Sequence, residues 1–297
     1  MDRKTMYRKF NIQELYGKLR KELRKYPKII MAELFVGLGM LAALLILSFL
    51  GEFIIPYNPL SLSNDLLVPP NLAHIMGTDN LGRDIASRVF AGAQISLTVA
   101  IIATAISVAI GTPLGVLSGY IGGKTDKILT LVADTFWGFP VIVLAMLVAW
   151  LMGPNAINTA FAVGIAVSPS FFRIVRSETL SIKEMVFVEA EKALGASSKR
   201  IAFLHILPNT LPSVFVLVTL RVGRSIIAVA GLGFLGLGVP PPTPELGTDL
   251  GVAREFLISG AWWLVVFPTL TIFLLTVCFN LISEGLGAIW KPKMKTV

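Results

Sequence analysis

The chain has 297 residues, of which 55% are apolar and only 15% are charged, whereas soluble globular proteins carry about 25% charged residues. Its apolar residues cluster in runs of about 20 or more, long enough to cross a bilayer, so these numbers exclude a soluble enzyme. The net charge is +8. The single cysteine, Cys278, excludes a disulfide framework and a cysteine metal site, and the two histidines, His74 and His205, are too far apart in the sequence to suggest a ligand pair.

A basic segment, residues 1–28, opens the chain. It holds ten Lys/Arg residues and three acidic residues. A nucleic-acid-binding arm is one interpretation of such a segment. Basic residues directly before a membrane span are more typical of contact with anionic lipids. We therefore expect membrane lipids and no nucleic acid as its partners.

Six apolar stretches predict six transmembrane helices. The first, Ile29–Leu50, shows no clear cleavage site and is interpreted as a retained anchor rather than a signal peptide. The others lie at 93–118, 129–152, 156–174, 210–238 and 262–287. The sequence thus divides into four parts: the basic segment (1–28), the first helix with an extracytoplasmic segment (29–92), a transmembrane domain (93–287) and a short tail (288–297).

The distribution of Lys and Arg predicts the orientation of these helices. If the N-terminus is cytoplasmic, the cytoplasmic segments hold 21 Lys/Arg residues and the opposite segments hold 3. Cytoplasmic loops of membrane proteins carry an excess of these residues. We therefore expect a cytoplasmic-membrane protein with both termini in the cytoplasm and with 51–92 and 239–261 outside.

Four glycines repeat at intervals of four residues in the second predicted span. They are Gly111, Gly115, Gly119 and Gly123, and such a row of small residues lets helix backbones approach closely in lipid. Packing within the chain and packing against a partner subunit both remain open.

Two nucleotide-binding patterns fail in their context. Gly231, Gly233 and Gly236 match G-x-G-x-x-G, but three prolines follow from residue 240 and prevent the helix that this motif requires. Gly123-Lys-Thr resembles the end of a P-loop, but Ser118 stands where the first glycine is needed. We predict no catalytic residue, cofactor or metal in this chain.

The long cytoplasmic loop at 173–209 predicts a short helix over 182–194. Ser181 and Glu184 match a capping box, Gly195 fits a left-handed helix stop, and a second helix can start at Ser197 or Ser198. One face of the first helix would place Glu189 among apolar residues, namely Ile182, Met185, Val186, Ala190 and Ala193. Because a buried carboxylate needs a partner, we expect this face to dock into another protein that supplies a cation. A helix lying on the membrane surface is the alternative.

The same loop resembles the EAA loop of ABC-importer permeases. The resemblance rests on Glu189-Ala190-Glu191, Gly195 and Ile206-Leu207-Pro208, with Glu191 in place of the second alanine. The G-T-D-x-x-G-R-D segment, which contains Asp79, Arg83 and Asp84, and the F-L-G-L-G-V segment from Phe234 are similar to the dipeptide/oligopeptide/nickel group. The basic N-terminus and the extra first span resemble the C-type subunit of that group.

The resemblance implies an all-α membrane protein with the ABC transporter type-1 permease fold and a cytoplasmic coupling helix. Contact with an ATPase subunit would involve Glu189, Ala190, Glu191, Gly195, Leu207 and Pro208. The implied partners are a B-type permease, two ABC ATPases that bind ATP and magnesium, and an extracytoplasmic binding protein facing 51–92 (with Asp79, Arg83 and Asp84) and 239–261.

The resemblance also implies a function, the ATP-driven uptake of dipeptides or oligopeptides by a non-catalytic permease subunit. Nickel, glutathione or oligosaccharide import is the alternative within the family. A membrane scaffold or sensor without a transport path is the alternative outside transport.

Two arginines, Arg221 and Arg224, stand three residues apart in the fifth predicted span. Intramembrane arginines usually face a water-filled cavity or a counter-ion, and Asp134 in the third predicted span is the candidate partner. These residues predict a polar translocation path that could meet the carboxylate of a peptide. A purely structural Asp–Arg bridge, or snorkelling to the interface, is the alternative.

Overall fold

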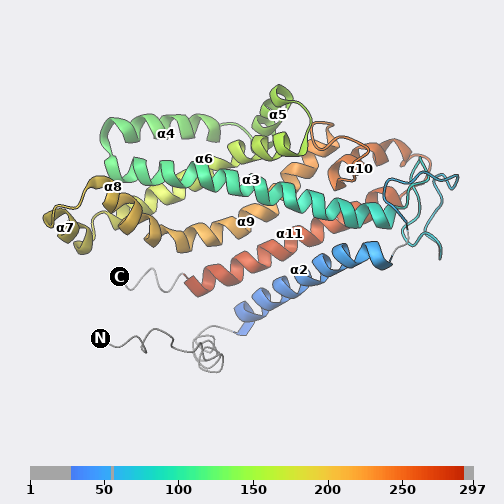
Figure 1. Ribbon diagram of the computed structural model, residues 1–297, viewed down its shortest axis with the longest axis horizontal. Coiled ribbons are helices and arrows are strands. Elements are labelled where there is room, and N and C mark those ends of the chain that lie inside the picture. The colour runs from blue at the N-terminus through green and yellow to red at the C-terminus, as the bar shows by residue number, and fades with distance from the viewer. Residues whose placement is uncertain (1–27, 55–56, 291–297) are drawn as a thin grey trace, which may run out of the picture.

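The structure is a computed structural model that describes residues 28–54 and 57–290. Within these residues it contains helices and no strand beyond one isolated bridge. Five helices are long and apolar enough to cross a membrane, and a bent pair makes up to six. In Figure 1 the long helices run side by side along the longest axis. They are α2 (Lys28–Ile54), α3 (Ile85–Ile121), α6 (Ala156–Ile182), α9 (Leu207–Phe234) and α11 (Trp263–Trp290).

The third predicted span, 129–152, is not one continuous helix. It consists of the end of α4 (Gly123–Trp137) and all of α5 (Val141–Met152), and these two helices meet at an angle of 94°. Gly138 ends α4 and Pro140 begins α5. Proline lacks an N–H and disfavours a helical conformation at the preceding residue, so the break follows from the local sequence.

All five long helices extend beyond their predicted limits at one end or both, most clearly α3, α6 and α9. Helix α3 begins before residue 93 because the Asp84 side chain accepts a hydrogen bond from the Ser87 N–H, which is the geometry of an N-cap. Helix α6 continues past residue 174. Helix α9 follows without a break from α8 (Ser198–Arg200) and the π-helix η2 (Ile201–Ile206).

Close contact between α3 and α6 accounts for three of the four regularly spaced glycines. A Cβ atom at Gly111 would lie 2.4 Å from the Ser168 carbonyl oxygen, at Gly115 2.8 Å from the Phe172 carbonyl oxygen, and at Gly119 2.7 Å from Thr179 Cβ. A Cβ atom at Gly123 would have no neighbour within 4 Å. The interpretation as packing within the chain is therefore confirmed for the first three glycines.

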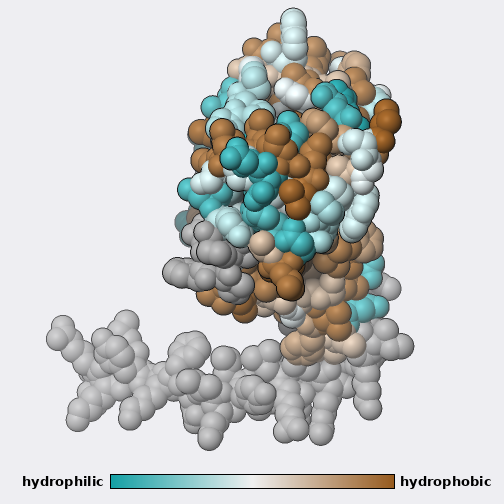
Figure 2. Space-filling view, turned by 90° about the vertical axis from the view of Figure 1, so that its right-hand side faces the viewer, coloured by the Kyte–Doolittle hydropathy of each residue, from teal (hydrophilic) through white to brown (hydrophobic). Residues whose placement is uncertain are grey.

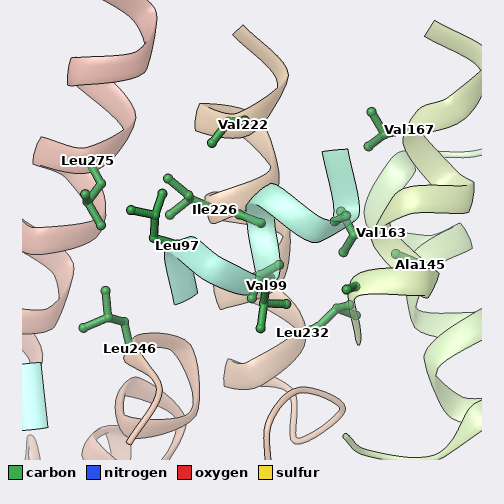
Figure 3. Close-up of a cluster of buried hydrophobic side chains, with 14 of the residues drawn as sticks. Leu97, Val99, Ala145, Val163, Val167, Val222, Ile226, Leu232, Leu246 and Leu275 are labelled. Carbon is green, nitrogen blue, oxygen red and sulfur yellow. The ribbon is translucent and has the colours of Figure 1, made fainter. Parts of the chain in front are cut away.

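One apolar cluster holds most of the helices together (Figure 3). Lipid tails are as apolar as these side chains, so close van der Waals packing, more than removal from water, favours this arrangement. The cluster joins residues from α3, α5, α6, α9, α10 (Leu246–Ala253) and α11. Those labelled in the figure are Leu97, Val99, Ala145, Val163, Val167, Val222, Ile226, Leu232, Leu246 and Leu275.

Candidate coupling surface and charged groups

The short helix α7 (Val186–Ala193) and the segment 57–84 lie at opposite ends of the molecule, the latter together with α10 (Figure 1). Because the long helices lie between these two ends, the ends emerge on opposite sides if the helices cross a membrane. The Lys/Arg distribution predicts that the α7 end is cytoplasmic.

The predicted helix 182–194 is only partly correct. Helix α6 continues to Ile182 and α7 starts at Val186. The proposed capping box is wrong because Ser181 lies inside α6, where its hydroxyl donates to the Ser177 carbonyl oxygen. Two other predictions are confirmed. Gly195 has the left-handed φ of +79°, and the Ser197 side chain caps the next helix by accepting from the Arg200 N–H.

One face of α7 is exposed although it is largely apolar. Val186 and Leu194 are 80% and 83% exposed, and they lie beside exposed Glu189, Ala190 and Ala193. We call these five residues the α7 docking face. Such apolar surface on a short helix is typical of a protein contact.

The opposite side of α7 is packed against the end of α6 and against η2. Val188 is fully buried in a small cluster with Ile182 of α6 and Ile201 and Ile206 of η2. Ile182 and the half-buried Met185 therefore do not belong to the docking face. This cluster packs α7 against the continuous helical stretch that begins at residue 198.

The remaining coupling candidates surround this anchor. Glu191 is half-buried, and its Oε2 lies 3.6 Å from Nε2 of His205 in η2. Gly195 and Pro208 are exposed, while Leu207 is half-buried against the main core. Contact of these residues with an ATPase stays a prediction.

Replacing Glu191 with alanine is expected to weaken this anchor modestly. Partly exposed ion pairs contribute about 1 kcal/mol or less, so ATP-driven uptake should fall by less than about fivefold. A double-mutant cycle with His205→Ala checks the contact, because the two effects should not add if the side chains interact. Strict additivity would contradict the interaction.

Asp134 pairs with a different arginine from those expected. Its Oδ1 lies 2.7 Å from Nη2 of Arg173, and the Arg173 guanidinium lies 4.6 Å from the ring centroid of Trp137. The expectation that Asp134 partners Arg221 or Arg224 is therefore wrong. The reason is that Asp134 lies in the last turn of α4, which packs against α6, the helix of Arg173.

Arg221 and Arg224 have no carboxylate within ion-pair distance among the described residues. The Nε atom of Arg221 is buried and has no hydrogen-bond acceptor there. Arg224 is exposed. These two side chains thus form a cationic site on α9 that this part of the chain does not neutralise.

A second ion pair, between Asp126 and Arg176, was not foreseen from the sequence. Nε and Nη2 of Arg176 donate to the two carboxylate oxygens of Asp126, each at 2.6 Å. The pair joins the start of α4 to α6 at the α7 end of the molecule. The sequence shows only that the two residues have opposite charges and lie in predicted cytoplasmic segments, which is not enough to predict that they pair.

Asp79, Arg83 and Asp84 are all buried inside the segment 57–84. Arg83 Nε donates to Asp79 Oδ2 at 2.6 Å, and Asp84 Oδ1 lies 2.9 Å from Nδ1 of His74. These contacts between buried side chains stabilise the conformation of the segment. The expectation that these three side chains themselves face a binding protein is therefore wrong, because they are buried. Contact between the rest of the predicted extracytoplasmic segment and a binding protein stays a prediction.

Arg88 joins three parts of the same end of the molecule. Its guanidinium forms an ion pair with Asp249 of α10 and donates to the carbonyl oxygens of Pro59 and Pro242. Burial raises the pKa of the Asp249 carboxyl group, and the guanidinium opposes that rise. The pair brings together the two segments that were expected to lie outside the membrane, although nothing in the sequence identified Asp249 as the partner.

Apolar side chains are exposed on this end as well. Figure 2 shows them intermixed with polar residues. Leu62, Leu72 and Ile258 are 70%, 103% and 99% exposed, and none of them lies in a candidate membrane span. This surface is therefore suited to contact with another protein. No group of three His, Cys, Asp or Glu side chains in the described part of the chain could hold a metal ion.

Comparison with known proteins gives a consistent result. Residues 111–296 match the family described as "Binding-protein-dependent transport system inner membrane component". The glutathione transport system permease protein GsiD of Pectobacterium atrosepticum is 39% identical over 264 residues, which are 88% of this chain and 87% of that protein. The dipeptide transport system permease protein DppC of Haemophilus influenzae is 38% identical over 267 residues, with coverage of 88% and 90%.

A solved structure shares the fold. It is described as an inward-facing conformation of the MetNI methionine ABC transporter, and one of its chains matches with a TM-score of 0.51 at 17% identity. The match covers 67% of this chain and 96% of that chain. It supports the type-1 permease arrangement of the helices.

Proposed function

The chain belongs to the family of binding-protein-dependent transport system inner membrane components, and we propose that with a B-type permease it forms the pathway for ATP-driven uptake of dipeptides or oligopeptides. Relatives named as glutathione and dipeptide permeases support this substrate class, because glutathione is itself a small peptide. A glutathione importer is the alternative within the same class. An extracytoplasmic binding protein would deliver the solute to the end that carries 57–84 and α10.

The α7 docking face is the observation that carries this proposal. It presents one carboxylate, Glu189, amid exposed apolar residues on a helix anchored to residues 198–234. A groove in an ABC ATPase with a cation opposite Glu189 would complement it. ATP and magnesium would bind to the two ATPase subunits, and closure of those subunits would move α7 and, through η2, the long helix α9.

Charged groups on α4, α6 and α9 are the candidates for the translocation path. The Asp134–Arg173 pair is 49% and 44% exposed at its side chains, and Arg224 is exposed on α9. Charged side chains in membrane spans usually face water or protein and not lipid. We propose that the partner permease and the aqueous path cover this surface.

Purification from its own membranes, followed by reconstitution, tests the proposal. Gentle extraction of the tagged chain should yield a second permease and two ABC ATPases by mass spectrometry, with an untagged strain as control. Proteoliposomes containing that complex and its binding protein should accumulate labelled di- or tripeptides only with ATP and magnesium. Recovery of the chain alone, without uptake, would favour a scaffold or sensor.

A further inference from the structure

Arg221 and Arg224 occupy the middle of α9. Arg221 is 14 residues from Leu207 and 13 from Phe234, or about 20 Å from either end at 1.5 Å per residue. Two cations near the centre of a candidate membrane span are costly unless they face water or a counter-ion. The stability of this chain alone therefore does not explain why two arginines occupy these positions.

These arginines lie along a side of α9 that the rest of the chain leaves partly open. Arg224 and Ile227 are exposed, Ile227 by 53%, and Arg221 is half-buried. Arg224 is three residues from both Arg221 and Ile227, so it lies about 60° from each of them around the helix. The Arg224 guanidinium is thus accessible from the surface that would meet the partner permease or the path, and the half-buried Arg221 lies beside it.

Among the described residues, four arginines form ion pairs with aspartates, whereas Arg221 and Arg224, like Arg200 and Arg254, do not. Arg83, Arg88, Arg173 and Arg176 each form an ion pair with an aspartate. No described carboxylate plays this role for Arg221 or Arg224, and the buried Arg221 Nε lacks any described acceptor. A buried donor without a partner marks a place where an acceptor from outside the chain is expected.

We propose that Arg221 and Arg224 bind the C-terminal carboxylate of the peptide as it passes through the permease, an inference that rests on the proposed function. A guanidinium group is planar, always protonated and matched to a carboxylate by paired hydrogen bonds. Asp134 does not compete for this site because it is bound to Arg173. The exposure of Arg224 lets the carboxylate enter and leave.

The experiment compares uptake of a labelled peptide with uptake of the same peptide as its C-terminal amide. Proteoliposomes would contain the full complex with wild-type chain, Arg221→Gln, Arg224→Gln, Arg224→Lys or Ile227→Ala. Every sample uses the same binding protein, so its own preference cancels when acid-to-amide ratios are compared. Ile227→Ala is the matched control on the same helix face without a charge.

In the wild type the acid should be favoured, and either glutamine variant should reduce the acid-to-amide ratio by about tenfold, the effect expected for a hydrogen bond to a charged group. Arg224→Lys keeps the charge but loses the paired hydrogen bonds, so it should fall between wild type and Arg224→Gln, and Ile227→Ala should not change the ratio. The amount of partner permease recovered with each variant measures assembly. If Arg221→Gln fails to assemble, the acid-to-amide ratio of Arg224→Gln decides the outcome, because Arg224 is exposed.

An unchanged ratio in Arg224→Gln would overturn the carboxylate site, as would equal uptake of acid and amide by the wild type. Loss of the partner permease from both glutamine variants would also overturn it, and would assign the arginines to an acid on that partner. Absence of ATP-driven peptide uptake by the wild-type complex would instead refute the proposed function. The two failures are therefore distinguishable.

Discussion

Replacement of Glu189 with lysine is expected to reduce ATP-driven uptake by more than about tenfold while the chain remains in the membrane. Glu189 is exposed on the α7 docking face, so the change should not disturb the chain's own packing. Removing one partner of a desolvated interfacial charge pair costs about 2–5 kcal/mol, and the reversed charge adds repulsion. The measurement is peptide uptake by proteoliposomes, together with the amount of ATPase that copurifies.

Glu184→Lys is the matched control. Glu184 is also exposed but lies between α6 and α7, outside the docking face. The same charge reversal there should change uptake by less than about twofold, because isolated surface charges contribute little. Wild-type uptake in Glu189→Lys would contradict a coupling role for this face.

The route by which α7 could act on the path follows from chain continuity. Val188 is packed against η2, and η2 continues directly into α9. The face of α9 that carries Arg224 lies farther along the same helical stretch. Displacement of α7 would therefore be transmitted to the arginines by a rigid element instead of a loop, which is how coupling between distant sites can be carried physically.

Local signals in the sequence predicted the features that depend on one short segment. Hydrophobic length located the spans, and Gly195 and Ser197 marked the end of one helix and the start of the next because their roles depend on nearby backbone alone. Ser181 misled the prediction because the pattern Ser-x-x-Glu is also compatible with a helix interior, where the hydroxyl bonds to the carbonyl four residues earlier. Pro140 could have predicted the break between α4 and α5, but the continuous apolar run around it favoured the prediction of a single span.

Pairings between distant segments could not be predicted in the same way. Arg88 and Asp249 are 161 residues apart, and Asp134 could have met any of several arginines. Which ones meet depends on how the helices pack, and that packing is set by shape as well as by charge. The sequence therefore identified Arg221 and Arg224 as unusual, whereas the structure was needed to show that Asp134 is not their partner.

Substitution of Gly111 with leucine is expected to destabilise the fold strongly. Even the first side-chain atom would lie 2.4 Å from the Ser168 carbonyl oxygen and 2.7 Å from Phe171 Cβ, and a backbone oxygen inside α6 cannot turn away. Overpacking usually costs about 1–3 kcal/mol, and a clash with backbone belongs at or above the upper end of that range. We expect the thermal midpoint in detergent to fall by at least about 5 °C, or the chain to be lost from the membrane.

Gly39→Leu provides the control for this change, because Gly39 lies in α2 and a Cβ atom there would have no neighbour within 4 Å. The same increase in side-chain volume should therefore leave the thermal midpoint within about 2 °C of the wild type. Gly111→Ala should fall between the two, since it introduces the clashing atom without the rest of the leucine. If Gly111→Leu accumulated and unfolded like Gly39→Leu, the close approach of α3 and α6 at this glycine would be wrong.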